Sequence, residues 1–239
     1  MATPYPYKIF ACGDHAVTID FGNIINEGIN DFILQLFNRA KQKSIYGIKD
    51  IIPAYSSITL VYDIMLVRSV SGDKSAYDFI KQAAEELLND NEPQEYAANR
   101  IMKIPACYED AFAPDLRQVA FEKKLSVEEI INIHTSKTYR VFMLGFLPGF
   151  AYMGIVDDSI SIPRRPAPRI NVTAGSIGIA GLQTGIYPLD SPGGWNIIAT
   201  TPMRLFNAAK SPPVVLQAGD NVRFYAVTGK EFKQIKSAQ

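Results

Sequence analysis

The stretch from Val141 to Phe206 constrains the fold of this chain most, because short apolar runs there alternate with glycine and proline. Residues 145–195 hold 9 of the 16 glycines and 6 of the 15 prolines. Such alternation is typical of short strands joined by tightly specified loops. The stretch therefore predicts a mostly β domain of barrel-like form, and rigid loops on such a wall are common places for a binding site.

The first hundred residues predict a different architecture. Apolar residues at helical spacing indicate two amphipathic helices, and alternating residues indicate a β-hairpin between them. After a first strand over 7–11, the order is β-α-β-β-α-β, which is the ferredoxin-like arrangement with both helices on one face of a sheet. The expected elements are helices over 25–40 and 76–88 and strands over 16–21, 48–54, 57–62 and 100–104.

A domain boundary is expected near residue 104, where the ferredoxin-like part ends and a proline-flanked segment begins. Helices are predicted over 115–124 and 126–135, and Ser126 with Glu129 forms the capping-box pattern that marks a helix start. From Tyr139 to about Val227 the pattern is mostly β. We therefore predict an α+β protein with two domains, 1–104 and 105–239.

Composition narrows the class of protein. The 239 residues are 47% apolar and 20% charged, which is typical of a soluble globular protein. No apolar run approaches the ~18 residues that span a bilayer, and the N-terminus lacks the pattern of a secretory signal. Two cysteines, Cys12 and Cys107, are too few for a disulfide framework or a structural zinc site. A cytoplasmic protein without a metal is expected.

Charge is balanced overall but unevenly placed. Residues 1–99 carry 8 basic and 13 acidic side chains, a net charge of −5, and residues 100–239 carry 16 and 11, a net charge of +5. Either this is ordinary surface variation, or the second half meets a carboxylate, a phosphate or an acidic partner. No basic stripe with interleaved aromatic residues is present, so nucleic acid is not an expected partner.

Three arginines in the loop PRRPAPR are the first candidates for a binding site. Prolines hold such a loop extended, and a fixed guanidinium loses less entropy when it binds a carboxylate or phosphate through two hydrogen bonds. The alternative is that they pair with Asp157, Asp158 or Asp190 and brace the barrel. These candidates are Arg164, Arg165 and Arg169.

A second group of candidates follows the arginines and is rich in glycine. The SPGG turn can present backbone N–H groups to an anion, or it can be an ordinary hairpin turn next to a core tryptophan. The apolar loop from Phe146 to Phe150 is either a pocket wall or a docking surface for another subunit. The candidates of this group are Gln183, Tyr187, Ser191, Gly193, Gly194, Trp195, Phe146 and Phe150.

The chemistry of catalysis is not visible in the sequence. His134, one of two histidines, is either a structural residue near a helix end or a site residue suited to proton transfer or anion contact. Cys107 fits a buried thiol better than a nucleophile. Neither GxxxxGK[ST] nor GxGxxG occurs, and Ser191 lacks a GxSxG context. We therefore assign no catalytic residue.

Several long motifs in order carry a family resemblance. These are GDHAVTIDFG, IPAYSSITLVYD, IPACY, PDL, LGFLPGFAYMG, IPRRPAPR, AGSIGIAGLQTGIYPL, SPGGW and TPMRLF. They resemble the allophanate hydrolase subunit 1 family, which includes the kinase inhibitor KipI and PxpB, the B subunit of bacterial 5-oxoprolinase. The likeness covers nearly the whole chain and implies a cyclophilin-like fold for the second domain.

The resemblance also implies a function. It implies a subunit of a complex that opens 5-oxo-L-proline to L-glutamate with ATP as cofactor of the complex, although no motif of this chain accounts for ATP. The implied partners are a homologous second subunit of the allophanate hydrolase subunit 2 (PxpC) type and a PxpA-type protein. The alternative is a KipI-like inhibitor that binds a sensor histidine kinase and has no turnover.

Overall fold

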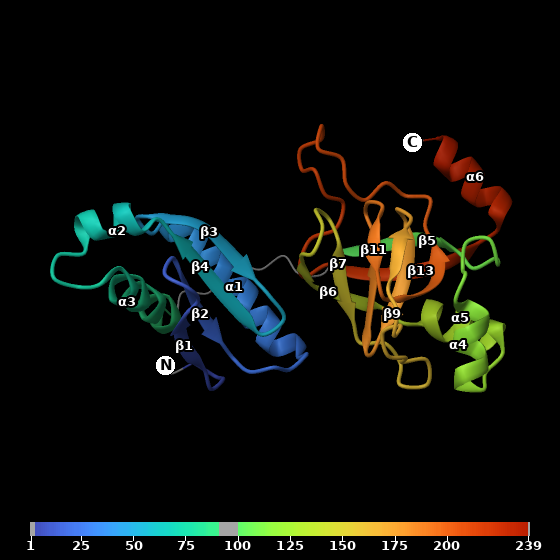
Figure 1. The fold of residues 1–239 in the computed structure, drawn as a ribbon, viewed down its shortest axis with the longest axis horizontal. Helices are drawn as coiled ribbons and strands as arrows, with labels where there is room; N and C mark the ends of the chain where they lie inside the picture. The colour runs from blue at the N-terminus through green and yellow to red at the C-terminus, as the bar shows by residue number, and fades with distance from the viewer. Residues whose placement is uncertain (1–2, 91–99, 239) are drawn as a thin grey trace. The chain divides into compact units, whose positions relative to one another are not determined.

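The chain forms two compact units, Met1–Ala97 and Ala98–Gln239, in the computed structural model, which describes residues 3–90 and 100–238 (Figure 1). Each unit has its own buried core. Within the described residues, no helix combines the length and the apolar character that a membrane crossing requires.

The first unit is a four-stranded antiparallel sheet with the strand order β1-β2-β4-β3. Alternate residues of the sheet, such as Val17 and Ile19, are buried together with the apolar faces of its two long helices. The predicted helices and hairpin are confirmed, and a short helix, α2, was not expected. The elements are β1 (Lys8–Ala11), β2 (Ala16–Asp20), α1 (Glu27–Lys43), β3 (Ile48–Pro53), β4 (Ser57–Tyr62), α2 (Ile64–Val70) and α3 (Ala76–Asn89).

The strand expected to close this sheet, residues 100–104, belongs to the second unit instead. It overlaps β5 (Ile101–Cys107), which pairs in parallel with β13 (Asn221–Val227) along its whole length. The edge beside β2 is taken by β1, which precedes the β-α-β-β-α arrangement in the chain. The division between the units therefore falls before β5, at residues 97/98, and not at 104/105.

The second unit is a closed barrel with the strand order β10-β7-β6-β13-β5-β12-β9 and a separate pair, β11-β8. Helix α5 packs against β13, α4 against β12, and α6 against β5. The remaining elements are α4 (Leu116–Lys123), α5 (Val127–Ser136), β6 (Tyr139–Leu144), β7 (Ala151–Gly154), β8 (Arg169–Val172), β9 (Ser176–Ala180), β10 (Gln183–Ile186), β11 (Ser191–Gly193), β12 (Asn196–Thr200) and α6 (Gly229–Ser237).

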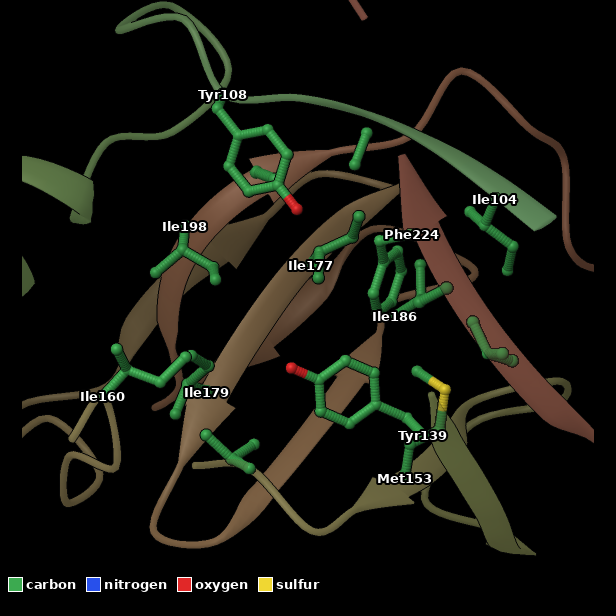
Figure 2. Packing of buried hydrophobic residues seen from close by; sticks show 14 of the residues in the cluster. Ile104, Tyr108, Tyr139, Met153, Ile160, Ile177, Ile179, Ile186, Ile198 and Phe224 are labelled. Carbon is green, nitrogen blue, oxygen red and sulfur yellow. The ribbon is translucent and has the colours of Figure 1, made fainter. Parts of the chain in front are cut away.

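Two features of this unit follow directly from its sequence. The capping box at Ser126 and Glu129 is present, since each side chain bonds the other residue's backbone N–H. Branched apolar residues of the strands fill the barrel interior, and Figure 2 shows them around the rings of Tyr108, Tyr139 and Phe224. The C-terminal helix α6 was not predicted, although Thr228 and Glu231 form a second capping box at its start.

Candidate functional site

A cavity of about 250 Å³ in the barrel unit collects eight of the twelve predicted site residues. Its walls come from the loop before β7, the PRRPAPR loop, and the segment from the end of β10 to the start of β12. We call it the aromatic–arginine pocket. It is lined by Phe146, Phe150, Tyr152, Arg164, Arg165, Pro168, Tyr187, Pro192, Gly193, Gly194 and Trp195.

Aromatic rings packed edge to face form the apolar walls. The ring of Phe150 lies 5.1 Å from that of Tyr187 and 5.5 Å from that of Trp195, both nearly perpendicular to it. Tyr152 completes the group at 4.7 Å from Phe150. These geometries suit the ring quadrupole and hold the walls rigid. Phe150 and Trp195 are buried, so of the two interpretations of the apolar loop, the structure favours the pocket wall.

Phe146 at the rim of the pocket is exposed and adopts a left-handed backbone. Its side chain is 61% accessible and its φ is 64°, a region that residues with a Cβ rarely enter. Its ring packs edge-on against Phe150 at 5.6 Å. A bulky residue in this conformation stores strain, and such strain clusters at ligand clamps and functional loops.

The PRRPAPR loop is fastened to the barrel on both sides of Arg164. The Asn196 side chain donates to the Pro163 carbonyl at 2.8 Å, and the Arg165 backbone N–H donates to the Gly194 carbonyl at 2.8 Å. The backbone of Arg164 is therefore fixed between two anchors, whereas its side chain is exposed.

Asp115 is the partner of the other two arginines. Its buried carboxylate accepts from Arg165 Nη1 at 2.8 Å and from Arg169 through two hydrogen bonds, 2.7 and 2.5 Å long. It also accepts from the Ile197 backbone N–H at 2.6 Å. The hydrogen bonds to Asp115 raise the pKa of the Arg169 guanidinium. Two of the three arginines thus brace the barrel, through Asp115 and not through Asp157, Asp158 or Asp190.

Asp115 was missed as a site residue because the sequence places it at the start of a predicted helix over 115–124. It is the N-cap residue of α4, yet its side chain makes no capping hydrogen bond, since both oxygens are engaged by the arginines and Ile197. The signal that pointed to it was the PDL motif of residues 114–116, which belongs to no visible strand or catalytic pattern.

Arg164 differs from its two neighbours. Across residues 3–90 and 100–238, no carboxylate lies within ion-pairing distance of it. Burial raises the pKa of the pocket phenols Tyr152 and Tyr187, and the charge of Arg164 opposes that rise in both. The guanidinium therefore lies close to two walls of the pocket without a countercharge from the described chain.

Ser191–Gly193 form strand β11, paired with β8, and not the tight turn that SPGG predicts. The two glycines of this segment have different roles. A Cβ at Gly193 would lie 2.5 Å from the Tyr187 hydroxyl and 2.8 Å from its ring, so a side chain there would displace a pocket wall. A Cβ at Gly194 would meet Pro168 at 3.7 Å, an ordinary contact. Gly193 is thus required by the pocket, and Gly194 is not.

Two buried polar atoms next to the pocket lack a partner in the described part of the chain. They are Arg165 Nε and Ser191 Oγ. Arg165 lines the pocket directly, and Ser191 precedes the lining residue Pro192 on β11. Buried polar atoms are normally satisfied, so these two are exceptions beside the pocket.

Three predicted residues lie elsewhere. Arg169 lines a neighbouring cavity of about 700 Å³, which Arg164 and Arg165 also line. Gln183 begins β10 and is half-buried in the barrel wall opposite Gly154 and Ala180. His134 is fully buried in the barrel, where it stacks on Phe224 at 4.6 Å.

His134 is held in a buried polar chain. The Thr184 hydroxyl donates to the Gly178 carbonyl at 3.0 Å, so it accepts from His134 Nε2 at 3.5 Å, and His134 Nδ1 then accepts from the Tyr108 hydroxyl at 2.6 Å. Burial lowers the pKa of His134 to about 3. The ring is therefore neutral near pH 7, and its environment is that of a core histidine.

The structure does not favour a cysteine nucleophile or a metal site in the described residues. Burial raises the pKa of the Cys107 thiol, which disfavours the nucleophilic thiolate. Among the described residues, no group of three or more His, Cys, Asp or Glu side chains is arranged to hold a metal ion.

Comparisons with known proteins agree with the motifs. The sequence model of the family described as "Carboxyltransferase domain, subdomain C and D" matches residues 7–216. The B subunit of 5-oxoprolinase from Bacillus subtilis (strain 168) is 41% identical over 233 residues, which cover 96% of this chain and 97% of that protein.

Two solved structures are also similar. TTHA0988 has a TM-score of 0.76 at 34% identity, and the match covers 90% of this chain but 40% of that one, so this chain spans two fifths of that protein. The conserved uncharacterized protein PH0987 from Pyrococcus horikoshii has a TM-score of 0.54 at 40% identity, covering 94% of this chain and all of that one.

Proposed function

This chain belongs to the family of carboxyltransferase domains, subdomains C and D, and from that membership we propose that it is the B subunit of a 5-oxoprolinase complex. The observation that carries the proposal is the 41% identity to the B subunit of the Bacillus subtilis 5-oxoprolinase over nearly the full length of both chains. The relative's name describes a subunit, and the match is of whole chain to whole chain.

The proposed reaction is the opening of the lactam ring of 5-oxo-L-proline to give L-glutamate, coupled to ATP hydrolysis in the complex. The sequence has no recognisable phosphate-binding loop, and its visible candidates for a nucleophile and a base, Cys107 and His134, are buried. This supports a division of labour in which other subunits supply ATP chemistry. We propose a homologous second subunit and a separate PxpA-type protein as the partners.

Reconstitution tests this proposal. The purified chain alone should form no glutamate from 5-oxoproline and ATP, whereas the chain with both partner proteins should, and leaving this chain out should abolish the activity. Turnover by the chain alone would contradict the subunit role. Activity of the partners without it would contradict its membership in the complex, and tight binding to a sensor histidine kinase would then favour the inhibitor alternative.

A further inference from the structure

The size of the aromatic–arginine pocket limits what it can hold. Its volume of about 250 Å³ lies just below the ~300–1,000 Å³ range of pockets that hold drug-sized ligands. A five-membered ring that carries one carboxylate is a compact ligand suited to a pocket of this kind.

The charge in the pocket selects an anion. Arg164 has an exposed guanidinium without a carboxylate partner in the described chain, and its backbone is anchored through Pro163 and Arg165. An anchored arginine matches a carboxylate in a planar, two-bonded geometry at low entropic cost. Arg165 and Arg169 are committed to Asp115, so among the described residues of this loop Arg164 is the cation left for a ligand.

The walls select a compact ring. Phe150, Tyr187 and Trp195 form a rigid apolar surface, and the absent Cβ of Gly193 keeps the Tyr187 ring in place. Arg165 also lines the pocket with a side chain that is 33% exposed, and its Nη1 bonds Asp115, so another N–H of its guanidinium can donate to a carbonyl on the ligand. The pocket therefore offers contacts for a carboxylate, an apolar ring and a ring carbonyl.

We propose that the aromatic–arginine pocket of this chain binds a small cyclic carboxylate of the 5-oxoproline type, with Arg164 as the residue that recognises the carboxylate. The proposal rests on the function proposed above for the identity of the ligand. It adds that the ligand is held by this subunit, in this pocket, and that the three neighbouring arginines are not equivalent.

Calorimetric titration of the purified full chain tests the inference without any partner. The probes are 5-oxoproline, 2-pyrrolidinone, which lacks the carboxylate, and cyclopentanecarboxylate, which lacks the lactam. We expect 5-oxoproline to bind, cyclopentanecarboxylate to bind more weakly, and 2-pyrrolidinone to bind least. Arg164→Gln should weaken 5-oxoproline binding roughly tenfold to hundredfold, the range for a charged hydrogen bond, and Arg164→Lys should lose less.

Matched variants separate recognition from folding. Arg223→Gln removes one exposed positive charge from the outer face of β13 and should bind like wild type. Gly193→Ala should lose binding because it displaces Tyr187. Circular dichroism establishes that each variant is folded.

The binding experiments and the reconstitution assay together distinguish a failure of the pocket assignment from a failure of the proposed 5-oxoprolinase function. If the wild-type chain binds none of the probes at millimolar concentration while the reconstituted complex forms glutamate, the ligand lies in another subunit and the inference is wrong. If Arg164→Gln and Arg223→Gln weaken binding equally, the role of Arg164 is wrong. If 5-oxoproline binding depends on Arg164 but the reconstituted complex shows no turnover, the pocket assignment is supported and the 5-oxoprolinase role is contradicted.

Discussion

Two regions of the barrel differ in how the chain satisfies their polar side chains. In the closed interior, His134 has a partner for each ring nitrogen, and the chain of hydrogen bonds ends on the Gly178 carbonyl. At the aromatic–arginine pocket, the described chain supplies no partner for Arg165 Nε and Ser191 Oγ and no countercharge for Arg164. The chain satisfies the polar groups around His134 by itself, whereas at the pocket the described chain leaves these groups without a partner.

This difference explains why residue type alone is a poor guide to function. A histidine is a good candidate for catalysis, but burial removes its charge and neighbouring hydroxyl groups use both of its nitrogens. An arginine is commonly a surface residue, but anchoring beside an aromatic wall makes it a candidate for recognition. Whether the protein itself satisfies a polar group separates the two cases.

The largest expected effect on stability comes from removing the carboxylate that pairs with Arg165 and Arg169, which leaves both arginines without a countercharge in the described chain, as Arg164 is. Asp115→Asn removes the charge that holds Arg165 and Arg169, and should lower the free energy of unfolding of the barrel by roughly 2–3 kcal/mol. This expected loss of unfolding free energy is smaller than the usual cost of breaking a buried ion pair, because the two arginine side chains are 33% and 26% exposed. Urea unfolding followed by fluorescence of Trp195, the one tryptophan, reports on the barrel specifically.

Asp110→Asn is the matched control for this substitution. Asp110 pairs with Arg117 by two hydrogen bonds of 2.8 Å, but the side chains are 71% and 75% exposed. Solvent screens such a pair, so the unfolding free energy should stay within the error of the urea titration. Equal losses at Asp110 and Asp115 would show that burial of the carboxylate contributes nothing.

Local sequence patterns predicted most of the secondary structure. The spacing of apolar residues located α1 and α3, the capping box located α5, and alternation located the hairpin of β3 and β4. These features depend on neighbours within one or two turns of chain. The assignment of β5 went wrong because a strand carries no local record of its partner, and β13 lies more than a hundred residues later.

The same distinction between local and long-range features applies to the candidate site. Glycines, aromatic residues and arginines that lie close together in sequence were grouped as candidates, and eight of them line one pocket. What the sequence could not supply was the partner of each arginine, because Asp115 lies 50 residues before Arg165. The sequence also did not predict the burial of His134. The helix that carries it is amphipathic, and its hydrogen-bond partners, Tyr108 and Thr184, are distant in sequence.

A pH series tests whether the barrel interior is as closed as the structure indicates. His134 has a pKa of about 3 in the folded chain, against 6.5 for an ordinary histidine. Below pH 6.5 the unfolded chain takes up a proton that the folded chain does not, so stability is lost as pH falls from 6.5 toward 3. The slope is about 1.4 kcal/mol per pH unit, or roughly 2 kcal/mol by pH 5.

His134→Gln removes this titration and provides the comparison. The difference in unfolding free energy between wild type and variant, measured by urea titration at pH 7, 6 and 5, should shrink as pH falls. Carboxylates titrate in both proteins, so their contribution cancels in the difference. A constant difference across this range would mean that His134 is accessible to protons in the folded barrel.

The smallest expected effect concerns strain at the pocket rim, which the barrel interior does not share. Phe146→Ala and Phe146→Gly lose the same ring contacts, but alanine keeps a Cβ at a φ of 64° and glycine does not. Phe146→Gly should therefore be more stable than Phe146→Ala by about 1 kcal/mol, the cost of a left-handed residue with a Cβ. Ala167→Gly, at an exposed loop position without positive φ, should show the opposite sign because glycine gains entropy when unfolded. Thermal melts of the four proteins, including wild type, measure both differences. If alanine is the more stable residue at both positions, the rim carries no strain, and Phe146 is simply an exposed ring on a relaxed turn.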